Sequence, residues 1–186
     1  LQRIKLSASD WGRCPRLVQP PTAGDHDEVM LQPDHPLPPY RYVPGQNPHP
    51  IKHPDGHAYG RPEPEPDWPD DGAWASCELH RHALDLFNHA YWWEAHEAWE
   101  VLWRLAPAES PERKALSGLI QSAAYRLKRA IGNDRAATTL LEKARANLAA
   151  AASCGRTVLA VECSALARSL DRDEEPLIRL ADAHGP

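Results

Sequence analysis

The chain has 186 residues, enough for one domain with a sizeable hydrophobic core. Its net charge of −5 at pH 7 excludes a polybasic protein that binds nucleic acid or membrane surfaces by bulk electrostatics. There is no apolar run of roughly 20 residues to span a bilayer, no apolar stretch of a secretory signal, and no C-x-x-C pair. We therefore expect a cytoplasmic protein with no membrane partner.

Proline divides the chain into two unlike parts. Fifteen of the 19 prolines lie in residues 1–75 and only four in residues 76–186. Because proline lacks an N–H and forces the preceding residue out of the helical conformation, no helix is expected in the first part. We predict an irregular proline-rich arm over residues 1–75 and a helical-bundle domain over residues 76–186.

The arm is expected to be extended, with turns at Pro44-Gly45 and Asp55-Gly56. Its apolar residues favour packing on the bundle from about Pro38 to Tyr59, over the face that carries His96, with residues 1–30 disordered. A wholly disordered arm is the alternative. Four histidines offer a metal site as a further alternative, although the prolines prevent a helix that would align them: His35, His49, His53 and His57.

Apolar residues at helical spacing predict five to six helices after residue 75. Their expected ranges are about 76–88, 92–105, 111–131, 134–152, 158–170 and 176–183. Ser76 and Ser110 are the expected N-caps of the first and third, with Pro111 at the first helical position. Gly132 and Gly155 end the third and fourth. No strand pattern appears, so the prediction is an all-α antiparallel bundle with short connections.

The second helix carries the polar residues of greatest chemical interest. At 100° per residue, His96 and Glu100 share a face at i and i+4, on the margin of a tryptophan-rich apolar face, and Glu97 points further outward. A half-buried imidazole beside a carboxylate must be hydrogen-bonded, ion-paired or bound to a metal. The spacing suits two ligands of one divalent metal ion. Three histidines of the first helix are candidates for a further ligand: His80, His82 and His89. His82 is the better candidate, because it falls on or near the apolar stripe of that helix.

A purely structural interpretation of the same residues is also open. Glu94, Glu97 and Glu100 are then helix-surface carboxylates, and Glu100 pairs with Arg104 at i and i+4. In this interpretation His96 is a hydrogen-bonded histidine at the edge of the core.

The second helix and its surroundings resemble a known family. Leu86-Phe87-Asn88, Tyr91 to Glu97, Glu100 and Trp103-Arg104 resemble the domain-of-unknown-function family 309, whose pattern is approximately F-N-x-G-x-[FY]-[FYW]-E-A-H-E-x-x-E-x-x-W. Residues 118–124 resemble its second motif. The resemblance covers about residues 76–150, and residues 38–50 look like an extension found in some members. The chain departs from the pattern at Ala90, where glycine is usual.

The resemblance implies a small all-α bundle that is loosely labelled a predicted metal-dependent hydrolase. Carried over position by position, it implies a site made of five polar residues. These are Asn88, His96, Glu97, Glu100 and Gln121.

Three functions remain open from the sequence. The first is a helical binding or structural module, whose partner is an unidentified small molecule or protein and whose oligomeric state is open. The second is a metal-dependent hydrolase in which His96 and Glu100 bind a divalent metal ion, Glu97 is the general base and Arg104 steadies an anionic substrate. The third, nucleic-acid binding through the basic residues from Arg126 to Arg145, is disfavoured because residues 76–186 hold 14 basic and 15 acidic residues.

Overall fold

The computed structural model describes residues 30–70, 73–170 and 178–181. Within these ranges the chain forms five α-helices, one 3-10 helix and two isolated β-bridges, but no β-strand. The elements are η2 (Ala73–Ser76), α1 (Glu78–Asn88), α2 (Trp92–Leu105), α3 (Pro111–Ala130), α4 (Asp134–Ala152) and α5 (Cys163–Ser169). The predicted all-α bundle is confirmed.

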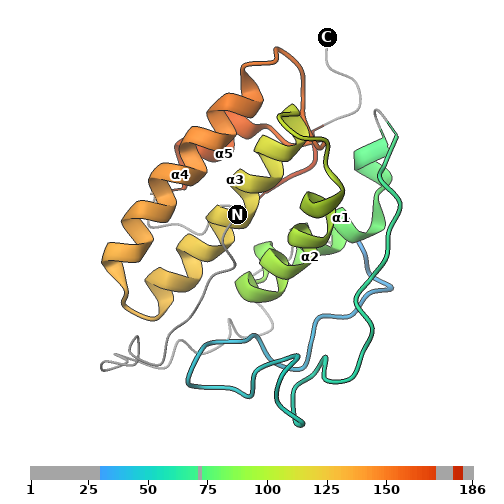
Figure 1. The fold of residues 1–186 in the computed structure, drawn as a ribbon, viewed down its shortest axis with the longest axis vertical. Coiled ribbons are helices and arrows are strands. Elements are labelled where there is room, and N and C mark those ends of the chain that lie inside the picture. The colour runs from blue at the N-terminus through green and yellow to red at the C-terminus, as the bar shows by residue number, and fades with distance from the viewer. Residues whose placement is uncertain (1–29, 71–72, 171–177, 182–186) are drawn as a thin grey trace.

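Helix α3 is at the centre of the bundle, where it packs against both α2 and α4 (Figure 1). Helix α1 packs against α2, and α5 packs against α4. Large apolar side chains from the first four helices fill the core: Leu84, Trp99, Leu102, Leu116, Leu119, Ile120 and Leu148. Burying each such side chain contributes about 1.5–3 kcal/mol, so these helices depend on one another for stability.

The helix ends that carry strong local signals lie where they were predicted. α2 spans Trp92–Leu105 and α4 spans Asp134–Ala152. At the start of α3, the Ser110 side chain accepts a hydrogen bond of 3.1 Å from the backbone N–H of Arg113, and proline occupies the first helical position. These capping interactions satisfy free backbone N–H groups at the start of the helix with residues nearby in sequence, so they need no tertiary contact.

Two predicted helix starts are wrong. Ser76 ends the 3-10 helix η2, and the N-cap of α1 is Cys77, which makes no side-chain capping bond. The fifth helix begins at Cys163 instead of Val158. Residues 158–161 form a tight turn in which Leu159 and Ala160 have positive φ values of 57° and 51°, a conformation that no helix contains.

The sixth helix is also wrong for the part that the structure describes. Residues 178–181 are not helical, and Leu180 forms an antiparallel bridge with Val161. The N–H of Ala181 donates to the carbonyl of Ala160 over 2.7 Å. The remaining residues of the predicted helix lie outside the described ranges.

Ala90, where the chain departs from the family pattern, has the backbone conformation of the glycine that is usual there. The N–H groups of Ala90 and Tyr91 donate to the carbonyls of Phe87 and Leu86, which is the Schellman arrangement at the end of a helix. Ala90 has a φ of 64°, in the left-handed region that favours glycine. The loop between α1 and α2 therefore keeps the glycine geometry although the residue is alanine.

The arm contains no helix or strand over residues 30–70 and runs past α1 and α2 (Figure 1). The turn at Pro44-Gly45 is closed by the N–H of Gln46 on the carbonyl of Val43, with a φ of 80° at Gly45. The N–H of Gly56 donates to the carbonyl of His53, which closes a turn centred on Pro54-Asp55, one residue before the predicted Asp55-Gly56 turn. The predicted turn at Pro44-Gly45 is confirmed, and the second turn is displaced by one residue.

Candidate functional site

Helix α2 brings three side chains with ligand atoms together. His96, Glu97 and Glu100 each offer one such atom, and the three atoms lie within 4.8 Å of one another. Nδ1 of His96 is 3.3 Å from Oε1 of Glu97 and 4.0 Å from Oε2 of Glu100. In the described part of the chain, no other group of three histidine, cysteine or acidic side chains meets this distance.

Exposure to solvent increases across the cluster. The exposed fraction of the side chain is 8% for His96, 15% for Glu100 and 37% for Glu97. Nδ1 of His96 is buried and makes no hydrogen bond, although it lies within ion-pair distance of both carboxylates. A buried nitrogen without a partner costs about 1–3 kcal/mol, and a proton or a cation shared with the carboxylates would offset that cost.

The three ligand atoms fit a divalent transition-metal ion that is intermediate between hard and soft. One imidazole nitrogen and two carboxylate oxygens are ligands for zinc, manganese or iron, whereas calcium and magnesium prefer oxygen alone. Three protein ligands leave coordination positions for water or a bound molecule. The unpartnered nitrogen of His96 supports this fit, because a metal ion would satisfy it.

Asn88 is held at a different place in the fold. Its Nδ2 donates to the carbonyl of Ile178 over 3.0 Å, and its Oδ1 accepts from the N–H of the same residue over 2.9 Å. The side chain therefore holds a residue near the end of the chain against the C-terminal end of α1. The structure does not bring Asn88 to His96.

The second family-like motif faces α4. A Cβ atom on Gly118 would lie 2.6 Å from Cγ of Leu148, so the glycine allows α3 and α4 to approach closely. Three residues later, Oε1 of Gln121 accepts a hydrogen bond of 2.9 Å from Asn147. Gln121 thus belongs to the α3–α4 contact and is not brought to His96.

Arg104 is paired with the arm. Its guanidinium forms an ion pair with Glu63, and this pair replaces the predicted pairing with Glu100. Both side chains are largely exposed, so the pair contributes little to stability. Its effect is to place a charge contact between the arm and α2.

The two histidines of α1 and the histidine at its C-cap have other partners than His96. His80 is fully buried, its Nε2 bonds to the carbonyl of Leu159 over 2.9 Å, and burial lowers its pKa to about 4. The ring of His82 packs 5.5 Å from that of His35. Nδ1 of His89 bonds to the carbonyl of its own helix, at Asp85. None of the three joins the cluster on α2.

Glu94 is a buried carboxylate of α2 that its position on the helix predicts to be exposed. Its side chain is only 5% exposed, and its Oε1 accepts hydrogen bonds from the N–H of Tyr42 over 2.8 Å and from Nε2 of His57 over 3.1 Å. On a helical wheel at 100° per residue, Glu94 lies roughly 140° from the centre of the apolar face, so amphipathicity assigns it to solvent. The arm buries it.

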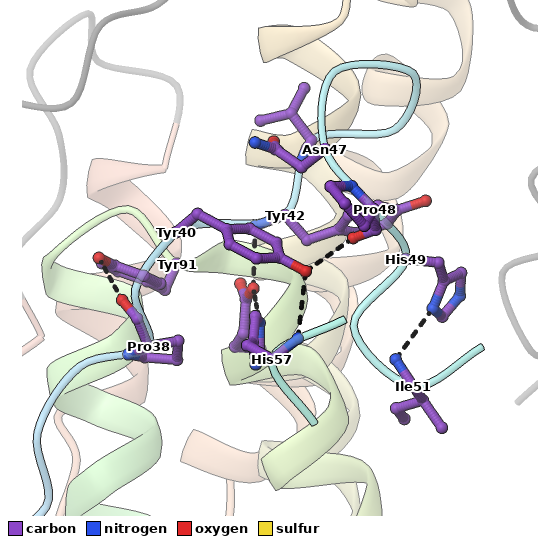
Figure 2. A network of polar contacts seen from close by, with 11 residues as sticks. Pro38, Tyr40, Tyr42, Asn47, Pro48, His49, Ile51, His57 and Tyr91 are labelled. Atoms are coloured by element: carbon purple, nitrogen blue, oxygen red, sulfur yellow. Dashed lines mark hydrogen bonds and ion pairs between the residues drawn. The ribbon is translucent and has the colours of Figure 1, made fainter. Parts of the chain in front are cut away.

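Figure 2 shows the network of polar contacts that the arm residues make near the start of α2, among them Tyr40, His57 and Pro38. The hydroxyl of Tyr40 donates to the carbonyl of Pro48 and accepts from the N–H of His57. The hydroxyl of Tyr91, just before α2, donates to the carbonyl of Pro38 over 3.0 Å. The network fixes the conformation of the arm where it crosses α2.

Asp85 of α1 binds the start of the described arm in a similar manner. Its two carboxylate oxygens accept hydrogen bonds from the N–H groups of Leu31 and Gln32, over 2.9 and 2.7 Å. Arg81 donates to the carbonyl of Leu31. The α1–α2 hairpin therefore binds extended backbone through three buried polar residues, Asp85, Asn88 and Glu94.

The arm histidines do not gather at one point. His57 binds Glu94, and the ring of His49 packs against the rings of Tyr42 and Trp93. His53 is exposed beside Asp55. The alternative of a metal site built from the arm alone therefore has no support in the described residues.

The basic residues from Arg126 to Arg145 do not form one open surface. Arg126 and Lys128 are buried, and Nη2 of Arg126 donates to the carbonyl of Leu170. Nε of Arg145 donates to the carbonyl of Ala167 over 3.1 Å. Arg126 and Arg145 thus bind backbone carbonyls of the α5 region, which weakens the nucleic-acid alternative.

A pocket and the lengths of the helices complete the description of the candidate sites. A pocket of about 290 Å³ lies where α4 ends and α5 begins, and none of the sequence-predicted site residues lines it. No helix in the described residues is both long and apolar enough to cross a bilayer.

Comparison with known proteins finds one matching family model, which carries no activity. The family model described as "Domain of unknown function (DUF309)" matches residues 80–140, which confirms the resemblance found in the sequence. The match includes Asp85, Asn88, Glu94 and the cluster on α2, whereas the backbone that the first three bind lies outside it. No curated protein and no solved structure matches the chain.

Proposed function

We propose that this DUF309 domain is a helical binding module with a divalent transition-metal site made of His96, Glu97 and Glu100. The observation that carries the proposal is the approach of three ligand atoms to within 4.8 Å of one another, one of them a buried nitrogen without a hydrogen bond. All three residues project from one rigid helix, so the site is largely preorganised. The ligand of the module, a small molecule or a protein, would bind at the remaining coordination positions.

Removal of His96 tests the metal site. We expect His96→Ala to weaken Zn²⁺ or Mn²⁺ binding by more than about 100-fold, because loss of an outer-shell partner alone typically costs 10–100-fold. Glu100→Gln should weaken binding in the same direction. The measurement is isothermal titration calorimetry of the metal-free protein, with metal content of the purified protein as a second readout.

Glu142→Gln is the matched control, because Glu142 is an exposed carboxylate on α4. It should bind the metal as the unmodified chain does. Equal affinity in His96→Ala and the unmodified chain, or no binding of zinc, manganese or iron by the unmodified chain, contradicts the proposal.

A metal-dependent hydrolase is a second candidate, and the exposure of Glu97 favours it. With 37% of its side chain exposed, Glu97 is the carboxylate of the cluster most accessible to solvent. In this version His96 and Glu100 would hold the metal ion, which would lower the pKa of a bound water. Glu97 would then accept a proton from that water as general base.

Glu97→Gln separates the two roles of this carboxylate. If Glu97 is a general base, the variant keeps its metal affinity and loses at least about 100-fold in the rate of hydrolysis of bis(p-nitrophenyl) phosphate or p-nitrophenyl acetate. If Glu97 is only a ligand, metal affinity falls. Absence of any metal-dependent hydrolysis of either probe by the unmodified chain contradicts the hydrolase.

A further inference from the structure

The start of the described arm, residues 30–37, is bound to α1 through its backbone. Both oxygens of Asp85 are in use, because one accepts the N–H of Leu31 over 2.9 Å and the other accepts the N–H of Gln32 over 2.7 Å. Arg81 donates to the carbonyl of Leu31. The docked segment therefore depends on a carboxylate that a competing donor on α1 could take from it.

Two imidazoles meet at the same contact between the arm and the helix. The ring of His35, from the arm, packs against the ring of His82, from α1, with ring centres 5.5 Å apart and an interplanar angle of 47°. Nδ1 of His82 is buried and makes no hydrogen bond, so a proton added there would create a buried charged donor without an acceptor. While the arm is docked, the surroundings of His82 thus favour its neutral ring.

The competing donor is His82 itself, once it is protonated. His82 faces two other titratable groups, His35 of the arm and Asp85 of its own helix, and the neighbouring Arg81 is bonded to the arm. Burial lowers the pKa of His82 and His35 lowers it further, whereas Asp85 opposes both.

Release of the segment changes each of these influences on His82. It removes the cover and the second imidazole, and it frees both oxygens of Asp85, which lies three residues later on the same face of α1. The pKa of His82 is therefore higher in the released state than in the docked state. Because the released state binds the proton more tightly, a falling pH favours release.

We propose that His82 and His35 form a pH-sensitive latch for residues 30–37, in which protonated His82 takes Asp85 from the backbone of Leu31 and Gln32 and the segment leaves α1. Docking is strongest above pH 6.5, the ordinary pKa of histidine, and weakens as the pH falls below it. The inference does not depend on the proposed metal site, because none of these residues belongs to it.

Amide hydrogen exchange followed by NMR tests the latch in metal-free protein. We expect the protection factors of the Leu31 and Gln32 amides, corrected for the intrinsic pH dependence of exchange, to fall by about fivefold between about pH 7.5 and 5.5. The linkage of one proton allows at most about tenfold per pH unit. The amide of Leu119, buried in the middle of α3, reports global unfolding and separates it from local release.

Two substitutions assign the effect to the two rings. His82→Phe keeps a ring against His35 but cannot be protonated, so the protection of the two amides should become independent of pH. His35→Phe, at an exposed residue of the arm, keeps the ring contact without the second imidazole and should reduce the fall in protection by about half. His53→Gln, at an arm histidine that lies beside Asp55, is the control and should keep the full fall.

Each outcome decides a separate step. Protection of Leu31 and Gln32 that stays constant between about pH 7.5 and 5.5 overturns the latch. A fall that persists in His82→Phe overturns the role of His82, and an undiminished fall in His35→Phe overturns the role of His35. A fall that Leu119 shares equally is global unfolding and also overturns the latch.

Discussion

The free energy of unfolding should fall by about 3 kcal/mol between pH 7 and pH 4 through the titration of His80 alone. His80 is fully buried, and both of its ring nitrogens are used: Nε2 bonds to the carbonyl of Leu159 and Nδ1 accepts from the indole N–H of Trp99 over 3.2 Å. A second proton on the ring would have to sit on Nδ1, facing the indole N–H. Protonation therefore breaks a buried hydrogen bond and leaves a charge in the core.

The direction of the pH dependence follows from the two pKa values. Burial lowers the pKa of His80 from 6.5 to about 4 in the folded protein, so the unfolded chain binds the proton first as the pH falls. The contribution of His80 to stability is complete above pH 6.5, decreases as the pH falls from 6.5 toward 4, and is lost below that range. A difference of roughly 2.5 pKa units at 1.36 kcal/mol each gives the expected magnitude.

Urea unfolding at a series of pH values measures this effect. His80→Gln should reduce the pH dependence between pH 6.5 and 4 relative to the unmodified chain, even if it is less stable at pH 7. His49 and His82, whose pKa values are also lowered, contribute to both proteins and cancel in the comparison. An identical pH profile for His80→Gln and the unmodified chain would refute the assignment.

Replacement of Glu94 should release the arm from α2. In Glu94→Ala the N–H of Tyr42 and the imidazole of His57 lose their shared acceptor in a buried place. An unsatisfied buried donor costs about 1–3 kcal/mol, so the arm can open more readily. We expect the free energy of unfolding to fall by an amount in that range, and hydrogen exchange at the Tyr42 amide to accelerate by about tenfold or more.

Hydrogen exchange followed by mass spectrometry over residues 38–48 measures the release directly. Glu94→Gln keeps a carbonyl acceptor for Tyr42 and should show a smaller effect than Glu94→Ala. The control is Glu142→Ala, which removes an exposed carboxylate from α4. Unchanged protection of Tyr42 in Glu94→Ala would show that Glu94 does not hold the arm.

The candidate site was predictable to the extent that it lies on one helix. His96 and Glu100 are one turn apart, and helix geometry alone places them on one face. Asn88, Gln121 and Arg104 could not be assigned in this way, because each has its partner elsewhere in the fold: Ile178, Asn147 and Glu63.

The fold shows the same division between local and distant causes. The range of α2 follows from its apolar spacing and the proline at position 107, and the start of α3 follows from Ser110 and Pro111. Residues 158–161 are apolar residues that the sequence pattern assigns to a helix, but they form a turn. Leu159 is buried in the core, and its carbonyl accepts a hydrogen bond from His80, which lies 79 positions earlier in the chain. No local pattern contains that contact.

The sequence by itself determined the all-α bundle, most of its helix ends, the turn at Pro44-Gly45 and the shared face of His96 and Glu100, because periodicity, capping and proline chemistry act over a few residues. Only the tertiary structure decided which polar residues are buried. Glu94 and Asp85 are buried because segments distant in sequence lie over them and supply their hydrogen-bond donors. Burial of a carboxylate requires partners, and here those partners come from at least 37 residues away in the chain.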